Sequence, residues 1–208
     1  DLDVWSPVMN FTARQTFVAG YRDPDVFAWL DRFIEPGMTV FDVGANVGVY
    51  GMFMAKRVSP ATCYAFEPNP VLRPFLESNK SSNGLHNLDL NFVGTGDREG
   101  AFCFETDESN LGQSHISASG GVQVSVVTLD GFVESRGIGQ IGFVKMDVEG
   151  FELPTLRGFE ATLRRDSDIV VLTEIEPKHM KRYGYSQSEL FAFMEGLGFT
   201  AYALEGAS

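Results

Sequence analysis

Acidic side chains close most of the apolar runs in this sequence of 208 residues. Asp42 lies in the first of these runs, and Glu67 ends the second. The others are Asp97 after the third run, Asp147 and Glu149 after a fourth, and Glu174 and Glu176 in a fifth. In an open parallel sheet, ligands bind beyond the carboxyl ends of the strands, so we expect these acids to gather along one edge. Carboxylates there could accept hydrogen bonds from ribose hydroxyls, attract a cationic ligand, or take up a proton.

The stretch FDVGANVGVY, Phe41 to Tyr50, predicts a strand, a turn with glycines and the start of a helix. Gly44 and Gly48 let the backbone approach a ligand, and the first N–H groups of the helix offer hydrogen bonds. Glu67 lies 19 residues past Gly48, near the ~20 at which an acid after the second strand accepts hydrogen bonds from a ribose. The combination predicts a ligand of the adenosine type.

The spacing of the turn argues against a dinucleotide. A dehydrogenase fingerprint needs glycine at positions 44, 46 and 49, whereas this sequence has Gly44, Asn46 and Val49. Asp42, two residues before the first glycine, is unfavourable beside a pyrophosphate and favourable beside a cation. We therefore expect a cationic adenosine ligand near Asp42, Gly44, Asn46 and Gly48.

Short apolar runs alternate with amphipathic segments of helical length along most of the chain. This alternation predicts a doubly wound, mainly parallel α/β sheet flanked by helices. We expect strands over 38–43, 61–66, 88–93, 141–148, 168–175 and 199–204, and helices over 24–35, 47–58, 70–83, 151–164 and 187–197. Residues 101–121 break the rhythm and predict a β-hairpin insertion with a polar loop near the cleft.

Composition excludes several classes of protein. The formal net charge is −12, from 16 basic and 28 acidic side chains, which makes a nucleic-acid partner unexpected. No run approaches the ~20 apolar residues of a transmembrane helix, and no signal peptide is recognisable. Cys63 and Cys103 form no C-x-x-C pair, so we expect buried thiols in a reducing cytoplasm and neither a zinc site nor a disulfide.

Several motifs resemble the FkbM family of class I S-adenosylmethionine-dependent methyltransferases. The resemblance rests on FDVGANVGVYGMFMAK (41–56), YAFEPNP (64–70), the segment 79–85, GTGDREG (94–100), NLGQS (110–114), VVTLDGF (126–132) and KMDVEGFELPTLRG (145–158). The last block is the most specific, because methyltransferases in general share the first two motifs and lack this one. We expect a helical lead-in over residues 1–36 and a methyltransferase domain over residues 37–208.

The resemblance implies a seven-stranded sheet and transfer of a methyl group from S-adenosylmethionine, typically to a hydroxyl of a sugar, glycolipid or natural product. It places the methionine part of the cofactor near Asp42, Gly44 and Asn46, the ribose on Glu67, and the adenine near Asp97. It places the methyl acceptor near Asp147 and Glu149. The partner is then a small-molecule or glycosidic acceptor, while the oligomeric state stays open.

Methylation of a hydroxyl oxygen needs a group that takes up its proton. Asp147, Glu149 and Glu174 are our catalytic candidates, and Asp147 is also a candidate for cofactor binding. Further candidates for the base are Glu152, Glu176, His115 and His179, although Glu152 is better explained as an acid that favours the start of a helix. Lys145 could pair with Asp147 or Glu149. Three acids on neighbouring strands do not make a coordination list, so we predict no metal.

Two alternatives remain at this point. A nicotinamide oxidoreductase would share the fold and Glu67 but lacks the third glycine of the fingerprint. A binding module that keeps the fold without turnover is the other.

Overall fold

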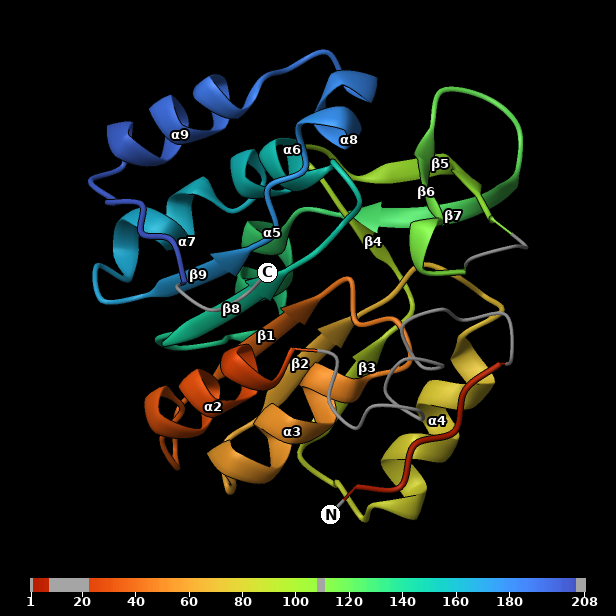
Figure 1. The fold of residues 1–208 in the computed structure, drawn as a ribbon, viewed down its shortest axis with the longest axis vertical. Helices are drawn as coiled ribbons and strands as arrows, with labels where there is room; N and C mark the ends of the chain where they lie inside the picture. Colours follow the sequence, from red (N-terminus) through yellow and green to blue (C-terminus); the bar gives the residue numbers. More distant parts are fainter. Residues whose placement is uncertain (1, 8–22, 108–110, 205–208) are drawn as a thin grey trace.

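A computed structural model describes residues 2–7, 23–107 and 111–204, and at its centre lies a five-stranded parallel sheet. The strands run in the order β3 (Leu88–Asn91), β2 (Cys63–Phe66), β1 (Val40–Val43), β8 (Phe143–Met146) and β9 (Val170–Thr173) (Figure 1). The order reverses at β1, between β2 and β8, which is where a doubly wound sheet offers its ligand crevice. The predicted fold class is therefore confirmed.

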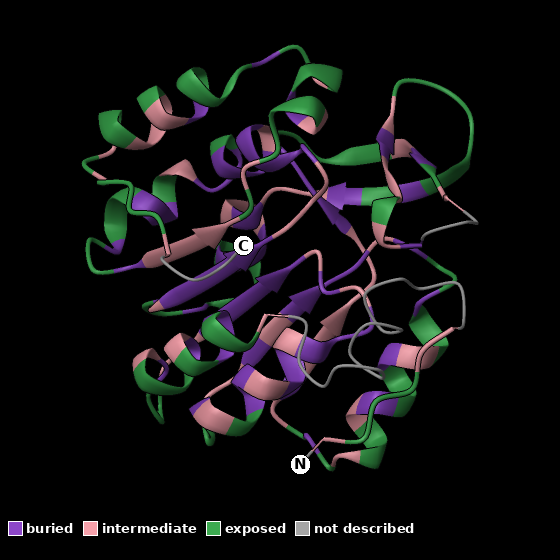
Figure 2. Cartoon of the chain, viewed as in Figure 1, coloured by how far each residue is buried: buried purple, intermediate pink, exposed green. Residues whose placement is uncertain are grey.

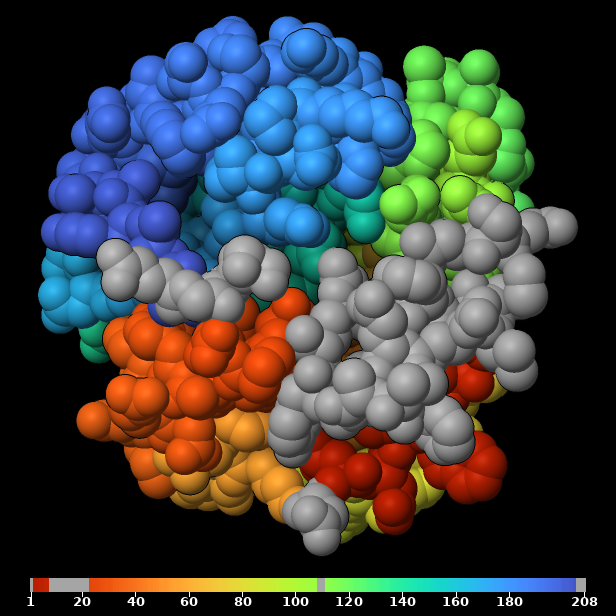
Figure 3. Space-filling view, viewed as in Figure 1, coloured from red at the N-terminus to blue at the C-terminus, as the bar shows by residue number. Residues whose placement is uncertain are grey.

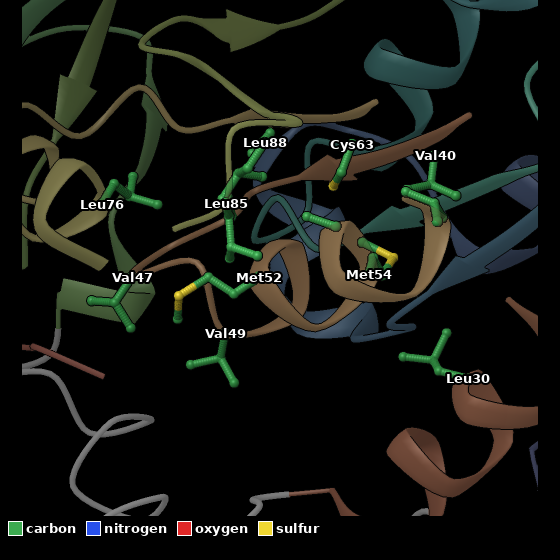
Figure 4. Packing of buried hydrophobic residues seen from close by; sticks show 14 of the residues in the cluster. Leu30, Val40, Val47, Val49, Met52, Met54, Cys63, Leu76, Leu85 and Leu88 are labelled. Carbon is green, nitrogen blue, oxygen red and sulfur yellow. The ribbon is translucent and has the colours of Figure 1, made fainter. Parts of the chain in front are cut away.

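Side chains of these strands pack into two hydrophobic cores, one on each face of the sheet. Val40, Cys63 and Leu88 pack with α2 (Pro24–Phe33), α3 (Val49–Val58) and α4 (Arg73–Ser82) on one face, as Figure 4 shows. Phe41 and Val43 pack on the other face with α5 (Leu129–Arg136), α6 (Glu152–Arg157) and α7 (Glu160–Arg165). Buried strands between outer helices with exposed outward faces are visible in Figure 2. Because successive residues of a strand point to opposite faces, the inner strands such as β1, β2 and β8 contribute to both cores.

A second, smaller sheet lies beside the carboxyl edge of the first. It consists of β4 (Gly94–Thr95), β7 (Val122–Val127), β5 (Gly100–Glu105) and β6 (His115–Ser117), with a 3-10 turn η1 (Leu111–Gln113) before β6. β5 pairs antiparallel with both β6 and β7, so the expected hairpin insertion is present. Residues 108–110 of its polar loop lie outside the described residues. Phe151, just before α6, packs against Phe104 and Ile116 and joins this sheet to the main body.

Three expectations about the second half of the chain were wrong. The helix expected over 151–164 is two helices, α6 and α7, which separate at Gly158 and Phe159, in keeping with the weak helix propensity of glycine. A short helix, α8 (Pro177–Arg182), precedes α9 (Gln187–Gly196) and was not predicted. Residues 199–204 do not form a strand. Tyr202 is 88% exposed, whereas Phe199 and Leu204 are partly buried against the cores without pairing to a neighbouring strand. Within the described residues the main sheet thus has five strands rather than seven.

The N-terminal part of the chain packs on the face formed by α3 and α4. Leu30 of α2 and Ile34 belong to the same core as α3, while residues 8–22 of the expected helical lead-in lie outside the described residues. Residues 2–7 run along α4 (Figures 1 and 3). Asn83 accepts from the Asp3 N–H at 2.9 Å and donates to its carbonyl at 2.7 Å, and Asn79 bonds in the same way to Trp5 at 2.6 and 2.9 Å. Two asparagine side chains thereby hold this segment in place.

Among the described residues, none of the helices has the length and apolar character needed to cross a membrane.

Candidate active site

A cavity opens at the carboxyl edge of the main sheet, between that edge and the second sheet. Its lining comes from the turns after β1, β2 and β8 together with the insertion. The lining residues include Gly44, Asn46, Glu67, Phe104, Leu111, Ser114, His115, Asp147, Glu149 and Phe151. The structure therefore brings together five of the predicted site residues, from three separate strand ends.

The turn after β1 packs directly against the backbone that follows β8. Gly44 has φ +81°, and a Cβ at this position would lie 1.8 Å from the Asp147 carbonyl oxygen. The N–H groups of Gly44 and Ala45 both donate to the Phe66 carbonyl at 3.0 Å, so the turn is also fixed to β2. Only glycine fits here, because any side chain would collide with the neighbouring main chain. Gly44 and Asn46 line the cavity, whereas Gly48 starts α3 beneath it and faces Leu76.

Glu67 is held at the cavity wall by backbone groups. One carboxylate oxygen accepts from the Asn46 N–H and the other from the Asn69 N–H, each at 2.8 Å. Burial raises the pKa of Glu67 to about 7, against the opposing effect of those two N–H donors. Each oxygen retains acceptor capacity, so the carboxylate is placed to receive the hydroxyls of a ribose.

Asp42 does not reach the cavity. Its side chain is fully buried beneath α3, and a Cβ on Gly51 of that helix would lie 2.9 Å from its Oδ2. Lys145 is its register partner on β8, with Nζ 3.6 Å from Asp42 Oδ1. Burial raises the pKa of Asp42, and Lys145 opposes that shift. Any effect of Asp42 on a ligand therefore passes through Lys145 rather than through direct contact.

The turn after β8 turns Glu149 toward the cavity and brings it to α8. Glu149 has φ +55°, an uncommon conformation for a residue with a side chain, and its Oε2 lies 3.0 Å from Nδ1 of His179. The next residue, Gly150, has φ +98°, and a Cβ there would lie 2.5 Å from the His179 carbonyl carbon. The glycine therefore allows α8 to approach closely enough for the pair to form.

The Glu149 carboxyl group is unusually basic. Burial raises its pKa to about 8, and Asp147, Glu174 and Glu152 push in the same direction, while Arg182 opposes them. Burial lowers the pKa of His179, with a further contribution from Arg182. A carboxyl group with a pKa near 8 is a much stronger proton acceptor than an ordinary glutamate. This carboxyl group also lines the cavity.

The other acidic candidates have different positions. Glu152 is buried and accepts from the N–H groups of Val148 and Gly150 at 3.2 and 3.1 Å and from the Tyr185 hydroxyl at 3.1 Å. Glu152 therefore stabilises the turn after β8 by accepting hydrogen bonds from its backbone. The exposed acids outside the cavity lining are Glu174 at the end of β9, Glu176 at the start of α8, and Asp97 past β4. The structure does not bring these three to the cavity.

The second sheet, which contains the predicted insertion, supplies the opposite wall of the cavity. His115 lines the cavity, with Nδ1 3.1 Å from the Gln113 carbonyl oxygen and Nε2 4.0 Å from Glu105. Ser114 accepts from the Asn69 side chain at 3.3 Å and so ties the insertion to the turn after β2. Phe104 and Leu111 add apolar surface. The alternation in FCFE could have identified Phe104, and the motif NLGQS includes Ser114, although neither was assigned a role from the sequence.

Within residues 2–7, 23–107 and 111–204, no three His, Cys, Asp or Glu side chains lie close enough together to hold a metal ion. Cys63 is a buried free thiol and Cys103 a partly buried one.

The family model of the methyltransferase FkbM domain matches residues 42–201, most of the chain. The chain belongs to the FkbM methyltransferase family. This confirms the resemblance drawn from the motifs and, with it, S-adenosylmethionine as the cofactor. The alternative of a nicotinamide oxidoreductase was therefore wrong. A buried carboxylate beside a glycine turn and a negatively charged wall suit a ribose and a cationic methionine group, so the residues of the cavity fit this cofactor.

Two relatives and one solved structure illustrate the family and the fold. The chain is 27% identical over 163 residues to hexuronic acid methyltransferase AglP of Haloferax volcanii, which covers 77% of this chain and 66% of that protein. It is 27% identical over 203 residues to 31-O-demethyl-FK506 methyltransferase FkbM of Streptomyces tacrolimicus, covering 82% of this chain and 75% of that one. It thus spans slightly less than two thirds of the first relative. A precorrin-6y C5,15-methyltransferase from Geobacter metallireducens shares the fold, with a TM-score of 0.52 at 13% identity, covering 85% of this chain and 72% of that one.

Proposed function

We propose that this protein transfers the methyl group of S-adenosylmethionine to a hydroxyl oxygen of a sugar, glycolipid or natural product. The observation that carries the proposal is the position of Glu149. It is a basic carboxyl group, paired with His179, on the same cavity as Gly44, Asn46 and Glu67. The names of the two relatives, one a methyltransferase of a hexuronic acid and the other of 31-O-demethyl-FK506, support a hydroxylated acceptor.

The roles of the residues follow from their places on the cavity. Glu67 would accept hydrogen bonds from the ribose hydroxyls, while Gly44 and Asn46 would flank the methionine part and Asp147 would face its positive charge. When bound, the cofactor supplies an activated methyl group on a positively charged sulfur. Binding both reactants in one cavity gives the rate advantage of proximity and alignment.

Glu149 would take up the hydroxyl proton as the acceptor oxygen forms its bond to the methyl carbon. The hydroxyl proton would end on the Glu149 carboxylate, while the cofactor would supply the methyl group and leave as the neutral thioether. His179 would hold that carboxylate in place through the contact at 3.0 Å. Because the carboxyl pKa is about 8, the rate of transfer should rise as the pH increases through this value.

Calorimetry and a transfer assay test the proposal together. We expect S-adenosylhomocysteine to bind and NAD not to bind. We also expect S-adenosylmethionine with a labelled methyl group to label hydroxylated acceptors, tested as hexuronic acids, neutral glycosides and 31-O-demethyl-FK506, with the product located by mass spectrometry. Binding of NAD, or no binding of either ligand, would contradict the proposal. Binding without transfer to any hydroxylated acceptor would favour a module without turnover.

A further inference from the structure

Lys145 lies near the end of β8, and its ammonium group is buried between the two turns that form the cofactor side of the cavity. Its Nζ donates to the Gly44 carbonyl at 3.1 Å and lies 3.5 Å from Asp147 Oδ2 and 3.6 Å from Asp42 Oδ1. The side chain is 9% exposed. The amine therefore joins the turn after β1 to the turn after β8.

The surroundings of Lys145 keep it charged. Burial disfavours the ammonium form, but Asp147 and Asp42 outweigh burial, and the pKa of Lys145 is raised. Tyr50 adds a favourable contact, with the ammonium group 5.0 Å from the centre of its ring. One buried cation thus faces two carboxylates, of which Asp42 is fully buried and Asp147 lines the cavity.

We propose that Lys145 is a positioning residue for the cofactor. Anchored by Asp42 from below, it fixes the Asp147 carboxylate and the Gly44 carbonyl at the wall that receives the cationic methionine part. The inference rests on the proposed function, since it concerns the same cofactor. It also gives Asp42 a role: Asp42 holds the amine that orients the groups facing the ligand.

A purely structural role for Lys145 makes a different prediction. If the lysine served only to neutralise Asp42, then removing both charges together would restore everything that removing the lysine alone had damaged. If Lys145 orients Asp147 and Gly44, the variant that lacks both charges would regain its stability, but its affinity for the cofactor would stay weakened. The two roles therefore separate in a double variant.

The experiment measures the melting temperature and the dissociation constant for S-adenosylhomocysteine of the full chain and its variants. In Lys145→Met we expect a lower melting temperature, because Asp42 is left buried without its partner, and affinity weakened by about tenfold or more. In Asp42→Asn/Lys145→Met the melting temperature should return close to that of the unmodified chain, while affinity stays weakened by about tenfold. Lys181→Met, at an exposed lysine of α8, is the matched control and should change neither quantity.

Each other result decides against the inference. Recovery of both stability and affinity in the double variant would show that Lys145 is only the partner of Asp42. Unchanged affinity in Lys145→Met would overturn the inference as well, and the double variant gives the same test if the single variant does not fold. If the unmodified chain fails to bind S-adenosylhomocysteine, the proposed function falls and this inference falls with it. If the unmodified chain binds S-adenosylhomocysteine and Lys145→Met binds it equally well, only the inference about Lys145 is overturned and the proposed function stands.

Discussion

The two sides of the cavity hold their carboxylates in different ways. On the side of β1 and β2, Glu67 is fixed by main-chain N–H groups from Asn46 and Asn69, which lie close to the cavity in neighbouring turns. On the side of β8, Glu149 has a strained backbone conformation and a side-chain partner, His179, on a helix 30 residues further along the chain. Main-chain donors cannot change their charge, whereas a histidine can. The first side is thus suited to binding, and the second to moving a proton.

The largest effect should come from the side of the cavity that carries Glu149. We expect Glu149→Gln to lower the rate of methyl transfer by about 100-fold or more, because the amide cannot take up a proton. Affinity for S-adenosylhomocysteine should stay within about twofold, since the carboxyl group is not assigned to the cofactor. Initial rates and calorimetry on the same preparation check this. A loss of cofactor affinity as large as the loss of rate would show that the two sides are not distinct.

The side of Glu67 should give the opposite pattern. In Glu67→Gln the amide NH₂ must face one of two main-chain N–H donors, so one hydrogen bond is lost and two donors meet. We expect affinity for S-adenosylhomocysteine to weaken by about 30-fold, or about 2 kcal/mol. Glu77→Gln, at an exposed glutamate of α4, is the control. Equal affinity in the two variants would remove Glu67 from the cofactor site.

The pH dependence of stability should reveal both carboxyl groups. The pKa of Glu67 is raised to about 7 and that of Glu149 to about 8, from an ordinary value of 4.5. Between 4.5 and these values the folded chain binds more protons than the unfolded chain, so the free energy of unfolding falls as pH rises. We expect a lower melting temperature at pH 8 than at pH 6, and a smaller difference in Glu149→Gln. Thermal denaturation at constant ionic strength measures both. A melting temperature that rises over this interval would contradict the prediction.

The smallest effect concerns Asp97. The resemblance to the family implied an adenine near this residue, but the structure leaves it exposed and outside the cavity lining. We expect Asp97→Asn to keep the dissociation constant for S-adenosylhomocysteine within about twofold of the unmodified value, as for a surface substitution. Calorimetry decides the matter, and a loss of tenfold would restore the original placement.

Sequence reasoning succeeded where the determining contacts are local. The turn at Gly44 and the acid at Glu67 follow from a strand, a turn and a helix in succession, and the structure places both on the cavity. The placement of Asp97 stays a prediction: β4 lines the cavity at Gly94 and Thr95, and Asp97 lies two residues further on, exposed and outside the lining. The positions of apolar runs in a sequence do not show which residues beyond a strand end reach the cavity.

Other features depend on contacts between distant segments. Asp42 looked like a ligand residue, but alternation along β1 directs its side chain under α3, where the register with Lys145 decides its role. The partner of Glu149 could not be chosen from the sequence, because α8 was not predicted, and the partner suggested for it, Lys145, pairs with Asp42 and Asp147 instead. Periodicity predicts which face a residue occupies and does not predict which element covers that face.

The docking of residues 2–7 on α4 depends on a match between two repeats. Four residues of an α-helix advance about 6 Å, and two residues of an extended chain advance about 6.6 Å. Asn79 and Asn83 therefore meet alternate residues, Trp5 and Asp3. These two helix side chains form hydrogen bonds with the extended backbone, as the edge of a neighbouring strand would. A one-residue insertion between Asp3 and Trp5 would put the two pairs out of step. Asn79 also donates to the Val47 carbonyl at 2.8 Å, so this amide gives the first residues and the turn before α3 a common point of attachment.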